Sequence, residues 1–427
     1  MNVVVMVLLG VAGLLVVSTP IFVSLLLPAI AGFTFSGLGM PPIAVVQHGV
    51  QGIAMPALLA VPLFMFAADV IARGEIADRL VDLADSLVGH IPGGIAIATI
   101  VTMTVFGAIS GVGVAAIVSI GPIAYPVLLR KGYSKSFALG LILSGSTLAM
   151  LIPPSVAVIL YGLQANQSIA KTFLSALGAG LIFAALMILY SVWYVLRKGL
   201  GRDDRFSARR LAEALRRSVL ALLFPVIILG GIYSGITTVT EAAAMAVAYA
   251  VIVEVFIYRR LTRKELFQVA RQSSGVIAMV MILIVGGSLL TWFLTLEQIP
   301  QAIAKSPMLN DPVMVLAVIN VVFLIAGMFV DVNSAIIVLT PLVFPAAASA
   351  GVDPIHLGAI LTMNLAIGMI SPPFGMNLFV GMATFRVGYG DVLRGILPFI
   401  MLQLIALVIV TYWPAATLWL PSLVSTR

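Results

Sequence analysis

Two apolar stretches of this chain carry the same pattern of helix-breaking residues, and this pattern constrains the fold more than any other feature. Residues 107–162 and 327–381 align without a gap when one is shifted by 219 positions. The shift places Pro122, Pro126, Gly132, Pro153, Pro154 and Gly162 on Pro341, Pro345, Gly351, Pro372, Pro373 and Gly381. Six matches at one offset, in a chain with 38 Gly and 23 Pro, indicate an internal duplication.

Each stretch contains a Pro-Pro pair inside an apolar run that is long enough to cross a bilayer. Proline lacks a backbone donor and its ring clashes with the preceding turn, so two in succession unwind a helix. The freed carbonyl groups cannot face hydrocarbon and are tolerated where they line a cavity or bind a ligand. A kink in a packed helix is the alternative. Because the pair recurs at matching positions, the pattern favours a binding role.

The composition is that of a polytopic, all-α membrane protein. Of the 427 residues, 62% are hydrophobic and 9% are charged, whereas soluble domains carry about 25% charge. The absence of Cys excludes a disulfide framework and a Cys nucleophile. The net charge of +7 does not indicate nucleic-acid binding, because the basic residues lie in loops beside spans. The N-terminus lacks a basic region, so we expect an uncleaved span there.

The first half, predicted as residues 1–210, combines scaffold spans with a hairpin and a broken helix. The spacing of Ile76, Leu80, Leu83 and Leu87 predicts an amphipathic arm helix over residues 69–94, lying at the membrane interface with a solvated charged face. The remaining expected elements are one long or two short spans in 1–32, a connection at 33–52, a span at 53–72, a hairpin and broken helix at 95–164, and a span at 172–196. The hairpin tip is expected near Ser110-Gly111, although one flexed span is the alternative.

The second half, predicted as residues 211–427, repeats this plan. Its expected elements are scaffold spans within 219–296, a less apolar stretch at 297–311, a hairpin and broken helix at 313–381, and a terminal span at 393–415. The loops 197–217 and 259–271 hold 13 of the 23 Lys and Arg residues, so we expect both to be cytoplasmic. Since the first half ends in a basic loop, we expect two inverted repeats.

Asp331 is the acid most suggestive of function, because a carboxylate flanked by apolar residues at membrane depth should face a cavity or a cation. A loop acid near the surface is the alternative interpretation. Asn333 lies two residues further on, and Ser110 is the approximate counterpart in the first half. Ser155 and Ser371 flank the two Pro-Pro pairs, and their hydroxyls are hard oxygen donors suited to alkali cations.

Other polar residues favour structural roles. Glu241 follows a Thr-rich turn and is expected in the first turn of a helix capped by Thr238 or Thr240. Glu254 is expected to pair with the arginines that follow it at the interface. The chain contains no P-loop, no Gly-x-Ser-x-Gly elbow, and no nucleophile–base or two-carboxylate constellation, so we do not expect an enzyme.

Four segments together resemble the large membrane subunit of tripartite ATP-independent periplasmic (TRAP) transporters, and the resemblance covers nearly the whole chain. The segments read SGVGVAAIVSIGPIAYPVLLRKGY, LAMLIPPSVAVILYG, YSGITTVTEAAAMAVAYA and GVDPIHLGAILTMNLAIGMISPPFGMNLFVG. The resemblance implies an elevator-type permease of the bacterial inner membrane, coupled to Na⁺. It also implies a small four-span membrane subunit, a periplasmic substrate-binding protein and an organic-acid substrate, C4-dicarboxylates and sialic acid being typical.

The resemblance also implies sites on this chain. The first sodium site would be formed by Ser110, Gly111, Ala149, Ile152 and Pro153. The second would be formed by Asp331, Asn333, Gly368, Ser371 and Pro372. Substrate would contact Ser110, Pro154, Ser155, Asp331, Asn333, Pro373 and Asn377. The sequence departs from the family pattern twice, since Val112 stands where the family often has Ser and Ala149 stands where it commonly has Gly. The alternative function is a stand-alone sodium- or proton-coupled anion carrier without a binding protein.

Overall fold

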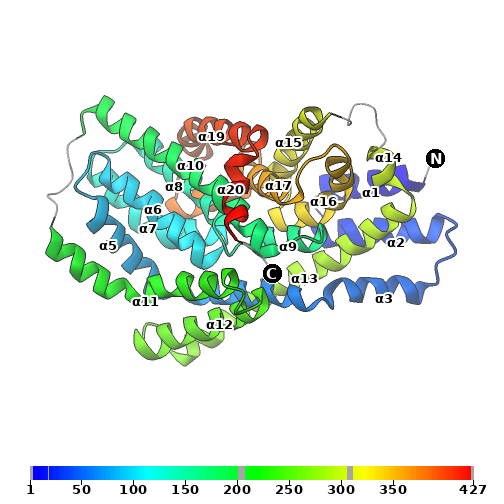
Figure 1. The fold of residues 1–427 in the computed structure, drawn as a ribbon, viewed down its shortest axis with the longest axis horizontal. Helices are drawn as coiled ribbons and strands as arrows, with labels where there is room; N and C mark the ends of the chain where they lie inside the picture. Colours follow the sequence, from blue (N-terminus) through cyan, green and yellow to red (C-terminus); the bar gives the residue numbers. More distant parts are fainter. Residues whose placement is uncertain (1–2, 18, 201–206, 305–310, 425–427) are drawn as a thin grey trace.

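The computed structural model describes residues 3–17, 19–200, 207–304 and 311–424. Within these ranges every regular element is a helix (Figure 1). Eight helices are long and apolar enough to cross a membrane, and two bent helix pairs could add two further spans. The expected all-α polytopic class is therefore confirmed. Parts of two predicted segments, residues 201–206 of the basic loop and 305–310 of the stretch at 297–311, lie outside the described residues.

The described residues of the first half form ten α-helices and one 3₁₀ turn. They are α1 (Val3–Val16), α2 (Ile21–Phe35), α3 (Pro42–Ile53), η1 (Pro56–Leu59), α4 (Ala60–Ala72), α5 (Ile76–Val88), α6 (Gly94–Ser110), α7 (Gly113–Arg130), α8 (Lys135–Leu151), α9 (Val156–Gln164) and α10 (Ile169–Lys198). Helices α1 and α2 pack on each other, so the described part of residues 1–32 contains two short helices.

The described residues of the second half form ten α-helices and one π-helix, and the last short helix was not predicted from the sequence. The elements are α11 (Ala208–Tyr233), α12 (Val239–Val251), the π-helical η2 (Ile252–Ile257), α13 (Arg263–Leu296), α14 (Ile299–Ala304), α15 (Pro312–Phe329), α16 (Val332–Ser349), α17 (Pro354–Gly368), α18 (Met376–Phe385), α19 (Tyr389–Tyr412) and α20 (Ala415–Leu423). Thr238 caps α12 in a capping box with Glu241, which confirms the predicted helix start.

The shift of 219 positions that aligns the breakers also aligns the helices. Helices α6, α7, α8, α9 and α10 correspond in order to α15, α16, α17, α18 and α19, with starting points that agree to within one residue. The packing corresponds too, because α7 contacts α18 and, reciprocally, α16 contacts α9. In Figure 1 the first hairpin, α6–α7, lies toward the left and the second, α15–α16, toward the right. The division at residue 210 and the inversion across a membrane stay predictions.

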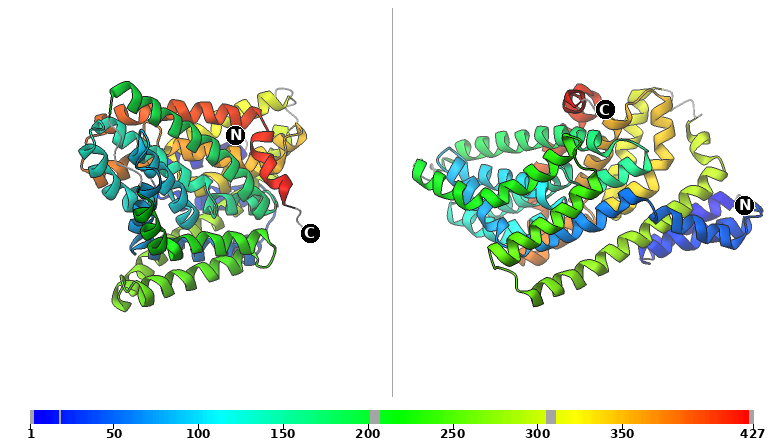
Figure 2. Two further views of the ribbon diagram at one scale, coloured as in Figure 1. Left: turned by 60° about the vertical axis from the view of Figure 1, so that its left-hand side comes forward. Right: turned by 60° about the horizontal axis from the view of Figure 1, so that its bottom comes forward.

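Two expectations for the first half were wrong in extent. The connection at 33–52 is helical from Pro42, because Pro at the first helical position leaves no donor unsatisfied, and α3 meets the η1–α4 helix at a bend of 56°. The arm helix spans only Ile76–Val88, because residues 69–72 belong to α4 and the chain turns at Gly74. The helix packs against α6 and α11 (Figure 2), and its buried residues include Ile76 and Leu80.

Glu254 does not form the expected ion pair with the following arginines. Its side chain is fully buried, and its carboxylate accepts hydrogen bonds from the backbone N–H groups of Glu75 at 2.9 Å and Ile76 at 3.2 Å. The carboxylate fills the space where a Cβ at Gly74 would stand. Glu254 therefore fixes the start of α5 by satisfying donors that the first turn leaves without partners.

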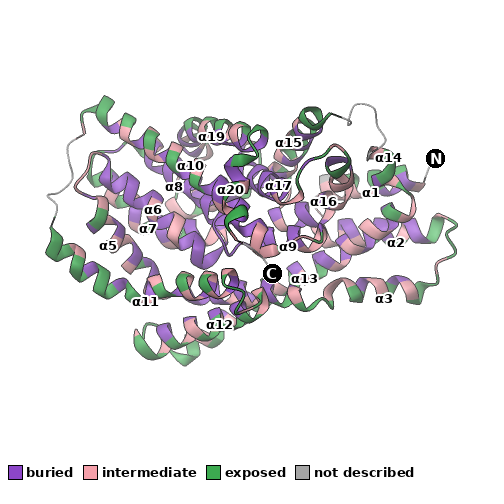
Figure 3. Ribbon diagram, in the orientation of Figure 1, coloured by how far each residue is buried: buried purple, intermediate pink, exposed green. Residues whose placement is uncertain are grey.

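The core of the molecule runs through the two broken helices. Every residue of α8 from Phe137 to Leu151 is buried, as is every residue of α17 from His356 to Gly368. Figure 3 shows this buried centre, with exposed residues concentrated on the outer helices such as α11 and α12. The exposed apolar residues of these outer helices fit a surface that faces lipid. The first Pro-Pro break is thus held inside protein, whereas the second reaches the surface at Pro373.

Candidate transport site

The first hairpin tip touches the first break directly. Gly111 follows α6 with φ +60°, a conformation that favours glycine, and a Cβ on Gly111 would overlap the carbonyl oxygen of Pro154. One turn earlier, a Cβ on Gly107 would lie 2.6 Å from the Cα of Ala149. Ser110, at the end of α6, is buried. The backbone contacts therefore bring the tip and the break into one site.

The first break exposes carbonyl oxygens that have no donor. In a helix the N–H of residue i bonds the carbonyl of residue i−4, so Pro153 and Pro154 leave the carbonyls of Ala149 and Met150 without that bond. The N–H of Ile152 bonds Leu148 instead. Within the described residues, no other donor reaches Ala149 or Met150. These oxygens are hard ligands of the kind that alkali cations bind.

Three helix N-termini around the breaks lack a side-chain cap. The N-cap residues are Val112 of α7, Ser155 of α9 and Gly375 of α18, and none of the three makes a capping hydrogen bond. The uncapped N–H groups and the positive ends of the helix dipoles attract anions, carboxylates included. At α18 the N–H groups of Asn377 and Leu378 already bond the carbonyls of Met369 and Gly375. Free carbonyls therefore meet the free N–H groups of α7 and α9 near the first break.

Asn377 connects the two halves at this point. Its Nδ2 donates to the Oγ of Ser146 on α8 at 3.0 Å, and a Cβ on Gly113 would lie 3.1 Å from the same nitrogen. Its Oδ1 is buried and has no hydrogen-bond partner within the described residues, and the same holds for the Oγ of Ser155. An unpartnered buried polar atom is uncommon in proteins, so both atoms are candidates to contact a ligand.

The second hairpin differs from the first at its tip. Asp331 is the N-cap of α16, and its carboxylate accepts bonds from the backbone N–H of Ser334 at 3.1 Å and from the Ser334 hydroxyl. At the offset of 219 its counterpart is Val112, two residues from Ser110, which is the approximate counterpart. Helices α15 and α17 are in close contact, as α6 and α8 are in the first half, because a Cβ on Gly368 would lie 2.5 Å from the Cα of Gly327.

The second break satisfies more of its own carbonyls. The oxygen of Gly368 accepts from the N–H of Ser371 at 2.9 Å, and that of Met369 accepts from the N–H of Asn377 at 3.0 Å. The first break therefore offers the more open oxygen set, although both Pro-Pro peptide bonds are cis. The carbonyl oxygen of Gly368 keeps one lone pair for a cation.

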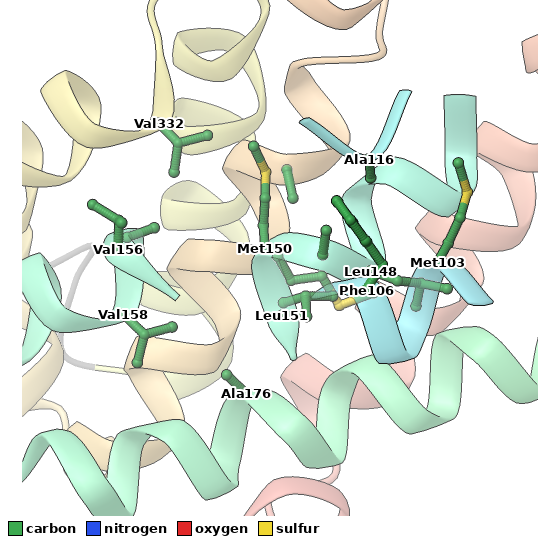
Figure 4. Packing of buried hydrophobic residues seen from close by; sticks show 14 of the residues in the cluster. Met103, Phe106, Ala116, Leu148, Met150, Leu151, Val156, Val158, Ala176 and Val332 are labelled. Atoms are coloured by element: carbon green, nitrogen blue, oxygen red, sulfur yellow. The ribbon is translucent and has the colours of Figure 1, made fainter. Parts of the chain in front are cut away.

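The predicted site residues fall into two groups by burial. The residues of the first set are all buried: Ser110, Gly111, Ala149, Ile152, Pro153, Pro154 and Ser155. In the second set Gly368, Ser371 and Asn377 are buried, Asp331, Asn333 and Pro372 are half-buried, and Pro373 is exposed. Figure 4 shows Val332 at the start of α16 near Val156 at the start of α9, which places the second tip beside the first break.

Sequence reasoning missed three residues at this site. Met150 could have been found by counting four residues back from Pro154, since the lost donor identifies the free carbonyl. Ser146 and Gly113 carried no such signal, because their role depends on contact with Asn377, more than 200 residues away in sequence.

The family model of the tripartite ATP-independent periplasmic transporter, DctM component, matches residues 8–416. The chain belongs to this family. It is 39% identical over 415 residues to the ectoine TRAP transporter large permease TeaC of Halomonas elongata, covering 96% of this chain and 97% of that protein. It is 40% identical over 368 residues to the C4-dicarboxylate TRAP transporter large permease DctM of Pseudomonas aeruginosa, covering 86% of each.

Two further comparisons bear on partners and fold. The isethionate TRAP transporter permease DctMQ of Oleidesulfovibrio alaskensis is 36% identical, covering 94% of this chain and 64% of that protein. The crystal structure of the Alcanivorax borkumensis YdaH transporter superposes with a TM-score of 0.61 at 13% identity, covering 87% of each chain, and supports the fold. Family membership makes this chain the large permease subunit of a secondary transporter for organic acids that works with a small membrane subunit and a periplasmic binding protein. It is not an enzyme.

Proposed function

We propose that the chain imports a small organic acid together with Na⁺, and that a C4-dicarboxylate is the first substrate to test. The observation that carries this proposal is the first hairpin tip, where free carbonyl oxygens and uncapped helix N-termini meet. Carbonyls bind the cation and N-termini bind the carboxylate, as at the discontinuous helices of transporters. A cation and an anion held side by side would stabilise each other, which gives a physical basis for coupling.

The proposed sites keep the residues predicted from the sequence, with one addition. The first sodium site uses the backbone oxygens of Ala149, Ile152 and Pro153 beside Ser110 and Gly111, to which we add Met150. The second uses Asp331 and Asn333 with Gly368, Ser371 and Pro372. The substrate lies between the tips and contacts Ser155 and Asn377, because these two carry the unpartnered buried atoms described above.

We further propose an elevator movement in the bacterial inner membrane. The close glycine contacts Gly107–Ala149 and Gly327–Gly368 make each hairpin and its broken helix one rigid unit, which supports movement of tip and break together. The remaining long helices, with the small four-span subunit, would form the scaffold. A periplasmic binding protein would deliver the substrate to the outward-facing site.

Reconstitution tests this function. The chain and its small subunit are placed in potassium-loaded liposomes, and uptake of labelled succinate, sialic acid and ectoine is measured with the cognate binding protein outside. We expect uptake with external NaCl, and background uptake in choline chloride. Equal uptake from choline driven by a proton gradient would refute sodium coupling. Full uptake without the binding protein would favour the stand-alone carrier.

A further inference from the structure

A charged groove lies between α5, the start of α11 and the end of η2, away from the transport site. Its larger part is a cavity of about 490 Å³ lined by Glu75, Asp78, Arg79, Asp82, Arg217 and Arg260. A smaller cavity of about 130 Å³ on the α11 side shares Arg79, Asp82 and Arg217 with it. The two form one continuous surface, which we call the arm groove.

Two of the charged side chains that line the larger cavity are already engaged. Arg79 forms a salt bridge with Glu75 at 2.9 Å, donates to the carbonyl of Arg217 at 2.6 Å, and stacks 3.8 Å from the ring centre of Tyr258. Arg79 and Glu75 are therefore part of the wall. They hold α5 against α11 and η2, so that the groove keeps its shape.

The other four charged side chains have no hydrogen bond or ion pair within the described residues. Asp78 and Asp82, one turn apart, lie on the same face of α5. Arg217 and Arg260 come from α11 and from the segment after η2. Burial raises the pKa of the Asp78 carboxyl, with Glu75 and Asp82 adding to the rise, while Arg260 opposes it. The groove thus presents two carboxylates and two guanidinium groups across an open space.

The groove lies where two long apolar helices end. The helices Ala208–Tyr233 and Val239–Ile257 are long and apolar enough to cross a membrane. Arg217 belongs to the first of them, and Arg260 follows the end of the second. A charged cavity beside the ends of two such spans fits an amphiphile at the membrane interface better than it fits a water-soluble anion.

We propose that the arm groove binds the headgroup of a zwitterionic phospholipid that carries a primary ammonium group, such as phosphatidylethanolamine. The phosphate lies on Arg217 and Arg260, and the ammonium donates to Asp78 and Asp82. The larger cavity is lined by three arginines and three acids, so it has no net charge for an anionic headgroup to neutralise. A trimethylammonium headgroup lacks the N–H donors that the two carboxylates would accept.

Native mass spectrometry of the permease with its small subunit tests the proposal. Dioleoyl phosphatidylethanolamine, phosphatidylglycerol and phosphatidylcholine are titrated separately in detergent. We expect phosphatidylethanolamine to bind about five-fold or more tightly than either other lipid, the effect of about one arginine at a lipid surface. Free phosphoethanolamine should compete weakly, because it lacks the acyl chains that would enter the adjoining bilayer.

Matched variants locate the binding. Arg217→Gln should reduce phosphatidylethanolamine binding about five-fold, and Arg260→Gln should do the same independently. Arg216→Gln, on the same helix but outside the groove, should leave binding unchanged. The double variant Asp78→Asn with Asp82→Asn removes the ammonium partners and leaves net positive charge. It should therefore transfer the preference to phosphatidylglycerol.

Four results would overturn the proposal. They are equal binding of the three lipids, an Arg217→Gln variant that behaves like Arg216→Gln, free phosphoethanolamine that binds as tightly as the lipid, and lipid binding to the isolated chain that the small subunit abolishes. The last result would make the arm groove a subunit contact. None of these measurements depends on transport, so the outcome is independent of the proposed substrate and ion.

Discussion

Gly111 is the residue on which the first hairpin tip depends most directly. Any side chain there would overlap the Pro154 carbonyl, in addition to the strain of φ +60°. We expect Gly111→Ala to lower sodium-driven uptake by about ten-fold or more, since backbone strain alone costs about 1–2 kcal/mol. Gly199→Ala is the matched control, because Gly199 has φ +64° and no atom within 4 Å. Similar uptake in the two variants would show that the tip tolerates separation from the break.

Asp331 combines a structural and a proposed ionic role, and one substitution separates them. Asn caps a helix about as well as Asp, so Asp331→Asn should leave α16 and the protein level unchanged. Loss of a charge-assisted contact worth about 1.5–3 kcal/mol should raise the sodium concentration for half-maximal uptake by about ten-fold or more. Asp353→Asn, at the N-cap of α17, is the control. An unaltered sodium dependence in Asp331→Asn would leave Asp331 as a cap only.

The sequence predicted those residues whose role follows from local chemistry. Pro153 and Pro372 identify the breaks because proline removes donors wherever it stands. Thr238 and Glu241 identify a helix start because a capping box is local. Glu254 was misjudged because its partners, the N–H groups of Glu75 and Ile76, lie about 180 residues away and only the fold brings them together.

At the scale of elements, the joint between α4 and α5 depends on Gly74 and Glu254. A Cβ on Gly74 would overlap the Glu254 carboxylate, which cannot withdraw without losing two backbone donors. We expect Gly74→Ala to cost about 1–3 kcal/mol, the range for overpacked sites, seen as a lower melting temperature of the purified protein. Gly275→Ala, in open space within α13, should be neutral or stabilising. An unchanged melting temperature in Gly74→Ala would show that the joint can rearrange.

The sequence predicted the long apolar helices and misjudged the elements whose limits depend on packing. The spans now seen as α10, α11, α13 and α19 were expected because continuous hydrophobicity is sufficient to identify them. Helix α3 was taken as a connection because its Gly and Pro residues have weak helix propensity, which packing against α13 overrides. The free carbonyls of the first break could be predicted because proline removes their donors. The hydrogen bonds that the carbonyls of the second break accept from Ser371 and Asn377 could not be predicted.

At the scale of the whole molecule, the orientation of every helix across the membrane follows once the basic loops are assigned to the cytoplasm. In Figure 1 the end of α10, the start of α11 and the end of α12 lie on the left, so the basic segments on both sides of α11–α12 share one end of the molecule. Basic loops stay in the cytoplasm. The turn between α11 and α12 lies at the far end of both helices and should therefore be periplasmic.

Cysteine labelling tests this assignment in a chain that has no native Cys. Arg209→Cys and Arg263→Cys report on the two basic segments, and Ile236→Cys reports on the α11–α12 turn, where Ile236 is 81% exposed. In intact spheroplasts an impermeant maleimide should label Ile236→Cys and spare the other two. After lysis all three should react, which controls for burial. Labelling of Arg209→Cys or Arg263→Cys before lysis would reverse the orientation and place the arm groove on the periplasmic side.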